Sequence, residues 1–231
     1  DQPRSRGLGD VYKRQVLALM ANTTAVFGPK LFGVLAKFVF TDWVGCLLIW
    51  FFFSGIVWLY TKVNYLEMCK SMIPIWVNTI ATNSSAGTIP ITLNVTTERL
   101  KVPMSIASFS IPLGATINLT GAALYKTILA FFVAEIYGLQ LTIDQILMVI
   151  IISTIMSIAA PGIPGGGIVT GAIFLNLLGL PMDLMGPIAG MYRLIDMSHT
   201  TVNVSGDVLG TMLVAKNENI WTGEDFNKTL V

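Results

Sequence analysis

An uncharged stretch interrupted by prolines and glycines limits what this chain can fold into. The run from Gln145 to Met182 contains no Asp, Glu, Lys or Arg, yet residues 160–167 spell APGIPGGG. The apolar run is typical of a membrane helix, but prolines and glycines weaken a helix interior. Broken backbone is tolerated within a membrane only where it is buried in protein or lines a polar cavity. We therefore expect this tract to be the tip of a re-entrant hairpin.

The composition indicates an integral membrane protein. Only 12% of the 231 residues are charged and 54% are hydrophobic, whereas soluble domains carry about 25% charge. The net charge of +1 implies neither an acidic nor a basic partner, and nothing suggests nucleic-acid binding. The single histidine and the two cysteines, Cys46 and Cys69, predict neither a metal cluster nor a disulfide framework.

The N-terminal part divides into a segment unlike the rest and a membrane region. Residues 1–15 are polar and basic and share no pattern with the remainder of the chain, so we expect them to be non-native and the chain to be a fragment. Residues 16–65 should hold the end of one transmembrane helix, over 16–27, and a complete spanning helix. That helix is predicted from about 40 to 62, or from nearer 34.

One order of parts occurs twice in the remaining chain. Residues 71–97 are broken by TNSSAGTIP and precede a helix with polar groups at 103–137; residues 145–178 precede another at 185–216. Paired interrupted segments in corresponding positions are typical of transporters with inverted repeats around a midplane site. The alternative is that each tract is a surface loop between two short helices.

The last of these helices carries a polar stripe. Asp196, Thr200, Asn203 and Asp207 are spaced by four, three and four residues, so they share one helix face. Ionisable groups within a spanning helix normally face a polar pathway. One carboxylate could bind an ammonium group, and the other could hold an alkali cation together with backbone carbonyls.

Two neighbours of the stripe have simpler interpretations. Arg193 is predicted to form a structural ion pair with Asp196, three residues further on. His199 could be a neutral helix residue held by a hydrogen bond. For Asp207 a structural ion pair is less favoured, because no cation lies one turn away on its face.

The motifs resemble those of the dicarboxylate/amino acid:cation symporter family, which includes the glutamate transporters. SSAGTIP is similar to the serine-rich tip of the family's first hairpin, and PGIPGGG to that of the second. IPLGATINLTGAALYK resembles the unwound seventh helix, and DMSHTTVNVSGD resembles the substrate and ion helix. The resemblance covers roughly residues 30–217. It implies hairpins at about 66–100 and 141–179, helices at about 103–138 and 182–217, and a polar tail at 218–231.

The resemblance also implies two sets of site residues. Asp196 would bind the substrate's amino group, while Thr200 and Asn203 would meet its carboxylate side. The substrate-binding positions are Ser84, Ser85, Ala122, Ile163, Gly167, Asp196, His199, Thr200 and Asn203. One sodium would bind at Gly114, Asn118, Asn203 and Asp207, and another at carbonyls of Thr116, Ser157, Ile158 and Ala160.

The departures from the family pattern concern substrate and ion number. His199 stands where glutamate carriers have arginine, and Ala122 where they have a threonine. Arginine would hold a side-chain carboxylate by two charged hydrogen bonds, so a neutral amino acid is favoured over an acidic one unless Arg193 substitutes. Thr120 replaces the carboxylate of a third cation site, which predicts fewer sodium ions per cycle.

We therefore expect an all-α membrane protein that moves an amino acid with sodium by an elevator mechanism, and not an enzyme. No cofactor other than the coupling sodium ions is implied. The full-length protein is expected to be a homotrimer in a cell membrane, specifically a bacterial inner membrane. A proton-coupled dicarboxylate carrier and a channel-like ion-conducting protein remain as alternatives.

Overall fold

The computed structural model describes residues 21, 25, 28, 30–160 and 162–228. Within these residues the regular elements are all helices, as the sequence predicts, and no strand is present. Residues 1–15 and most of 16–27 lie outside the described part. The helices are α2 (Lys30–Thr61), α3 (Tyr65–Thr82), α4 (Ser85–Asn94), the π-helix η1 (Val95–Arg99), α5 (Met104–Ile117), α6 (Thr120–Ile136), α7 (Ile143–Ile158), α8 (Gly166–Leu177), α9 (Met185–Asn217) and α10 (Gly223–Lys228).

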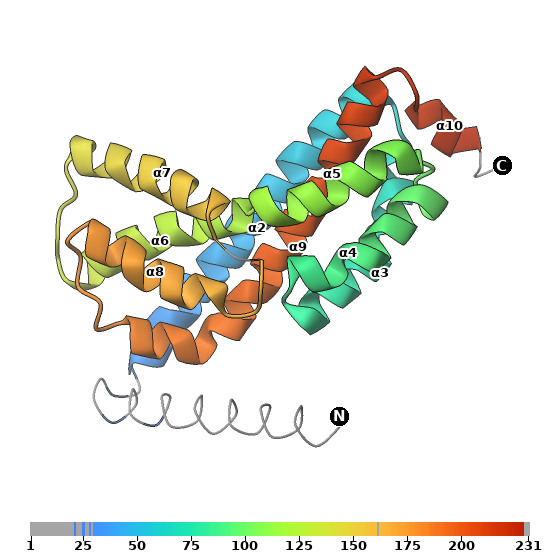
Figure 1. Cartoon of the computed structure of the whole chain (residues 1–231). Helices are drawn as coiled ribbons and strands as arrows, with labels where there is room; N and C mark the ends of the chain where they lie inside the picture. The colour runs from blue at the N-terminus through green and yellow to red at the C-terminus, as the bar shows by residue number, and fades with distance from the viewer. Residues whose placement is uncertain (1–20, 22–24, 26–27, 29, 161, 229–231) are drawn as a thin grey trace.

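Two long helices connect two lobes (Figure 1). Helices α2 and α9 run side by side in the same direction, with α6, α7 and α8 around their N-terminal halves and α3, α4 and α5 around their C-terminal halves. Each lobe has its own apolar core. Phe38, Leu129 and Phe174 belong to the first core, and Met72, Ile111 and Met212 belong to the second.

The backbone is interrupted at the places where the sequence predicts breaks. Helices α3 and α4 form a hairpin joined by Asn83 and Ser84, and α7 and α8 form a second one joined by residues 159–165. Asn118 and Leu119 separate α5 from α6. In Figure 1 the tips of both hairpins and this break meet near the middle of α9.

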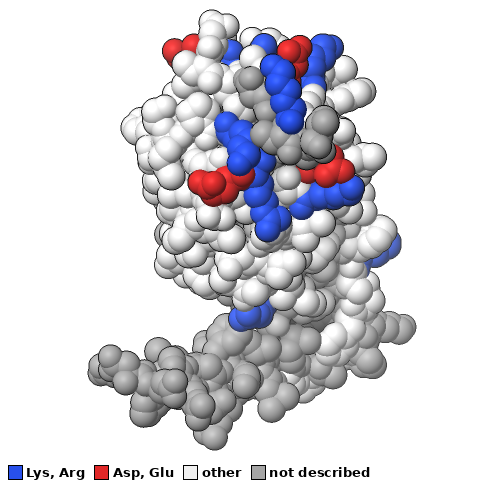
Figure 2. Space-filling view, turned by 90° about the vertical axis from the view of Figure 1, so that its right-hand side faces the viewer, with Lys and Arg blue, Asp and Glu red and all other residues white. Residues whose placement is uncertain are grey.

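The apolar surface agrees with a membrane protein. Two segments are long and apolar enough to span a membrane, Phe32–Thr61 and Met104–Ile136, while α7 and α8 are shorter apolar helices. The first span begins at Phe32, closer to the predicted start near 34 than to that at 40, since Lys37 interrupts the apolar pattern without ending the helix. In Figure 2 charged side chains gather toward the upper part of the face shown, and a broad, nearly uncharged area lies below them.

The sequence predicts a polar tail at 218–231, but the described part of this segment packs against the rest of the protein. Trp221 and Phe226 are buried in the second core, and the Trp221 indole N–H donates to the carbonyl of Leu100 at 3.1 Å. Asn227 holds the turn between α2 and α3 by accepting from Asn64 N and donating to Lys62 O. Two buried apolar side chains and these hydrogen bonds together anchor the segment.

Candidate functional site

A small cavity of about 30 Å³ lies where the breaks converge on α9. It is bordered by the first turns of three helices, through Ser85 of α4, Ala122 of α6 and Gly167 of α8. The complete lining is Asn83, Ser85, Leu119, Ala122, Ala160, Gly162, Ile163, Gly167, Tyr192, Asp196, His199, Thr200 and Asn203. Every predicted substrate-binding residue except Ser84 is therefore brought together here.

The tip of the first hairpin is fixed by its own side chains and by α9. Asn83 ends α3 in the left-handed region, with φ 52°, and its side-chain amide donates to the Arg193 carbonyl at 2.9 Å. Ser84 is the N-cap of α4 and accepts from Gly87 N. Ser84 thus stands beside the cavity as a cap, while the Asn83 side chain lines it.

The tip of the second hairpin contacts both α9 and the first tip. Gly165, with φ +78°, donates its backbone N–H to Asp196 Oδ2 at 3.1 Å. Gly162 O accepts from Ser84 Oγ at 3.2 Å. A Cβ at Gly167 would clash with the Tyr192 hydroxyl, so this glycine permits the close approach of α8 to α9.

The start of α6 is capped from a distance. No local side chain caps this helix, but the Gly121 N–H donates to Asn203 Oδ1 at 2.7 Å. A Cβ at Gly121 would lie 2.6 Å from the Cα of His199, which shows how tightly α6 packs against α9. The Gly121 N–H therefore fixes the orientation of the Asn203 side-chain amide.

The cavity lining combines features that favour anions with one that favours cations. The N-termini of α4, α6 and α8 border it, and the partial positive charge at a helix N-terminus favours anions. Asp196 supplies a carboxylate, with Thr200 one turn further along α9. Such an arrangement can bind a zwitterion, with its carboxylate near the helix starts and its ammonium group near Asp196.

The predicted sodium ligands around Asp207 form a second cluster. Asn118 Nδ2 donates to Asp207 Oδ1 at 2.8 Å and to the Asn203 carbonyl at 3.2 Å. Thr120 donates to Asn118 Oδ1 at 2.7 Å and so orients this amide. Gly114 lies so close that a Cβ there would clash with Asp207 Oδ1. These oxygens converge on one donor, and hard cations such as sodium prefer such oxygen ligands.

The predicted carbonyl site is assembled less completely. Thr116 belongs to the last turn of α5, and Ser157 and Ile158 to the last turn of α7, and these two helices are in contact. Ala160 lines the small cavity instead. Helix C-termini present free carbonyls, so the residue types suit a cation even though Ala160 also serves the neighbouring site.

The predicted ion pair between Arg193 and Asp196 is wrong. Arg193 is exposed, and its guanidinium donates to the Ala81 carbonyl at 3.3 Å. Asp196 instead accepts from Gly165 N. Although the two residues are three apart on α9, the last turn of α3 offers Arg193 a carbonyl acceptor. Arg193 also does not line the cavity, so it does not take the place of the family arginine there.

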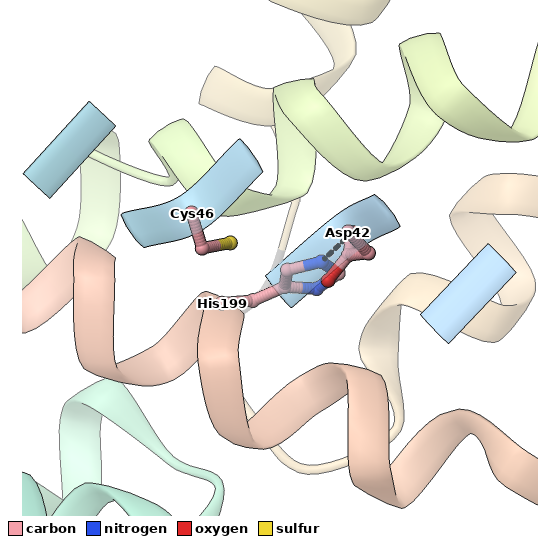
Figure 3. Close-up of side chains that lie close together, drawn as sticks. All are labelled: Asp42, Cys46 and His199. Atoms are coloured by element: carbon pink, nitrogen blue, oxygen red, sulfur yellow. Dashed lines mark hydrogen bonds and ion pairs between the residues drawn. The ribbon is translucent and has the colours of Figure 1, made fainter. Parts of the chain in front are cut away.

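His199 has a partner that local sequence patterns did not predict (Figure 3). Its Nε2 lies 2.8 Å from Asp42 Oδ1, and both side chains are buried. This confirms the interpretation of His199 as a hydrogen-bonded residue, and His199 also lines the cavity. A charged residue within an apolar span is the signal that could have singled out Asp42. Its pairing across 157 positions was not visible in any local spacing.

Comparison with known proteins identifies the family. The profile of the sodium:dicarboxylate symporter family matches residues 14–217, so the match extends further toward the N-terminus than residue 30. An excitatory amino acid transporter of Caenorhabditis elegans is 36% identical over 154 residues, covering 67% of this chain and 31% of the relative.

Two further relatives differ in the substrates that their names state. Excitatory amino acid transporter 3 of Mus musculus is 42% identical over 134 residues, covering 58% of this chain and 26% of the relative. Neutral amino acid transporter A of Bos taurus is 33% identical over 181 residues, covering 76% and 33%. The chain thus spans between about a quarter and a third of the length of these curated relatives, which are named as transporters. The resemblance noted from the motifs is confirmed: the chain belongs to the sodium:dicarboxylate symporter family.

Proposed function

We propose that the protein is a secondary active transporter that carries a neutral amino acid across a membrane together with sodium. The observation that supports this most is the cavity that is lined by the N-termini of three helices and by Asp196. An amino acid has the matching charges on one carbon atom. Relatives are named for both excitatory and neutral amino acids, so the family alone leaves the substrate class open.

The substrate roles follow from charge and position. Asp196 binds the ammonium group by a charge-assisted hydrogen bond. Ser85, Thr200 and Asn203, with backbone N–H groups at the helix starts, bind the carboxylate. Ala122 and His199 lie beside the substrate side chain, where the family's acidic carriers have a threonine and an arginine. No arginine lines this cavity, so the side-chain carboxylate of an acidic amino acid would find no guanidinium group to bind it by two hydrogen bonds.

Sodium binds where Asn118 now bridges two oxygens. Asp207 Oδ1 and the Asn203 carbonyl are its ligands, together with the Gly114 carbonyl and the Asn118 side chain. Thr120 cannot supply a negative charge, so fewer ions are coupled than in carriers with a carboxylate at this position. A second ion binds at carbonyls of Thr116, Ser157, Ile158 and Ala160.

The two hairpins are re-entrant in the membrane and belong to inverted repeats, each followed by a helix that contributes to the site. Residues 66–217 form the transport core, and the second hairpin acts as the gate. The cavity of about 30 Å³ is far below the size of an amino acid, so binding requires this gate to open. The full-length protein is a homotrimer in a cell membrane, and its core moves as an elevator.

Uptake into liposomes tests this function, with the chain in its full-length context. Radiolabelled alanine is supplied under an inward sodium gradient, an inward proton gradient, or neither. We expect saturable uptake with sodium only, and competition by serine and threonine but not by aspartate. Uptake driven only by protons, or an ohmic current without saturable uptake, would overturn the proposal. Strong competition by aspartate would overturn the neutral class while leaving sodium coupling intact.

A further inference from the structure

A buried hydrogen-bonded pair lies behind the cavity wall. Asp42 of α2 and His199 of α9 are 0% and 2% exposed, and their contact of 2.8 Å joins two helices that are far apart in sequence. Ser198 Oγ lies 2.9 Å from the second Asp42 oxygen and also 2.7 Å from the Ile195 carbonyl. Each Asp42 oxygen therefore faces a group that can donate a hydrogen bond, as an ionised carboxylate requires.

Cys46 completes the group drawn in Figure 3. Its thiol lies close to Asp42 and His199, and these three are ligand types for zinc. Both Asp42 oxygens and His199 Nε2 are already used in hydrogen bonds, however. We therefore treat the group as a hydrogen-bonded pair with a neighbouring thiol, and a bound metal is one outcome of the experiment that tests it.

The other nitrogen of His199 has no partner. Nδ1 is buried and accepts or donates no hydrogen bond among the described residues, while the residue lines the cavity. The ring of Tyr125 is 5.4 Å away between centroids, but its hydroxyl is also without a partner among those residues and does not satisfy Nδ1. An atom in this state is available to a molecule that enters the cavity.

The position of the ring proton of His199 sets whether Nδ1 donates or accepts a hydrogen bond. If Nε2–H donates to the Asp42 carboxylate, a neutral imidazole has a bare lone pair at Nδ1. No acceptor lies beside Nδ1 among the described residues, so a neutral ring with its N–H on Nε2 leaves no donor unpaired. The resting pair therefore leaves an unpaired acceptor, Nδ1, on a residue that lines the cavity.

We propose that Asp42 is a positioning residue for specificity: it holds the proton of His199 on Nε2, so that Nδ1 accepts a hydrogen bond from the substrate's side chain. The preferred substrates then carry a donor, such as the hydroxyl of serine or threonine. Alanine is accepted without this bond, and aspartate, which offers only acceptors, is excluded. This inference rests on the proposed transport function and refines its substrate class.

The test compares serine with alanine in the same liposomes, with the chain in its full-length context. Sodium-driven alanine uptake reports the transport function alone, and the ratio of serine to alanine kcat/KM reports the bond to Nδ1. For the wild type we expect a ratio of about 5 to 10, the worth of one neutral hydrogen bond. Alanine uptake with a ratio near 1 overturns the inference but leaves the transport function standing. Absence of any sodium-driven uptake overturns both.

The Asp42→Asn variant keeps the shape but removes the charge that holds the proton on Nε2. His199 can then present an N–H at Nδ1. We expect the serine preference to fall to about 1–2 and aspartate to become a competitor, with alanine uptake retained. A purely structural role of Asp42 would lower serine and alanine uptake equally and would give no aspartate competition, and that result overturns the inference.

The double variant Asp42→Asn/His199→Leu removes the buried charge and its partner together, so no unpaired ion remains if the single variant fails to fold. We expect it to lose the serine preference without gaining aspartate competition. A retained serine preference in this variant overturns the inference. Cys46→Ser is the matched control, one turn from Asp42 on α2, and should match the wild type. If it changes the ratio as strongly as Asp42→Asn, or if zinc alone abolishes the wild-type preference, the cluster is a metal site and the inference fails.

Discussion

The two hairpins have the same outline but hold their tips in different ways. The first tip is two residues long and is fixed by its own side chains, the Ser84 cap and the Asn83 amide. The second tip runs over 159–165, has no side-chain cap at the start of α8, and is joined to α9 through a backbone N–H of Gly165. Among the described residues, the second tip therefore has fewer hydrogen bonds from its own side chains to break when it moves.

The first helix of the first hairpin is also buried more deeply than the first helix of the second hairpin. Met68, Met72 and Ile75 of α3 are completely buried in the second core, whereas α7 exposes most of its apolar side chains. Figure 1 shows α7 at the outside of its lobe. A segment with fewer buried contacts and no local cap opens at lower free energy. We therefore expect the second hairpin to be the moving element, a difference that substitutions at and around the tips can test.

The largest effect should come from Asp196, the residue to which the second tip is bonded. Asp196→Asn removes the charge that would bind the ammonium group, so we expect sodium-driven uptake to fall more than about 100-fold. The Gly165 N–H can still donate to the amide oxygen, so the hairpin should stay folded. Uptake and thermal unfolding are measured together.

Asp183→Asn is the matched control, because Asp183 lies in the connection before α9 and accepts from the Tyr137 hydroxyl away from the cavity. It should leave uptake within about twofold of the wild type. Near-normal transport by Asp196→Asn would contradict its role at the ammonium group.

Locking the two tips together should give the next largest effect. A Cβ at Gly162 would lie 3.5 Å from the Cβ of Ser85, a separation that suits a disulfide. With Cys46 and Cys69 replaced by serine, Ser85→Cys/Gly162→Cys should form this bond on oxidation and lose at least about 90% of uptake, which reduction restores.

The single variants Ser85→Cys and Gly162→Cys control for the space that each side chain needs, since the added Cβ at Gly162 would also approach the Ala115 carbonyl. They should not respond to oxidation. Full uptake with the disulfide formed would show that the second tip does not move away from the first.

A smaller and more selective effect is expected at Gly114, which belongs to neither tip. In Gly114→Ala the new Cβ would clash with Asp207 Oδ1 and displace the carboxylate. We expect the sodium concentration for half-maximal uptake to rise about tenfold, since weaker ion ligation of about 1.4 kcal/mol has this effect. Uptake at saturating sodium should be nearly normal.

Gly210→Ala is the control for Gly114→Ala, because no atom lies within 4 Å of a Cβ at that position. An unchanged sodium dependence in Gly114→Ala would show that Asp207 does not bind the coupled sodium.

The smallest effect should come from the outer end of the second hairpin. Thr142 caps α7 by accepting from Gln145 N, and the Gln145 side chain bonds back to Thr142 N. Thr142→Ala should cost about 1 kcal/mol of stability and lower the unfolding temperature by a few degrees without changing uptake. A loss of transport as large as that from the locked tips would mean that the outer end also takes part in gating.

The sequence by itself determined the helical architecture and most of the site. Charge-free runs marked the membrane elements, and Gly, Pro and hydroxyl residues marked the breaks, because both effects are local along the chain. The spacing of Asp196, Thr200 and Asn203 placed them on one face, and all three line the cavity. These features depend on backbone propensity and helical period, which neighbouring residues set.

Only the tertiary structure decided which distant groups meet. Three hydrogen bonds each join separate helices. They link Asp42 to His199, Gly121 at the start of α6 to Asn203, and Arg193 to the Ala81 carbonyl. The docking of Trp221 and Phe226 depends in the same way on a core built by other segments. Side-chain partners across such distances are set by the packing of whole helices, and local spacing carries no information about it.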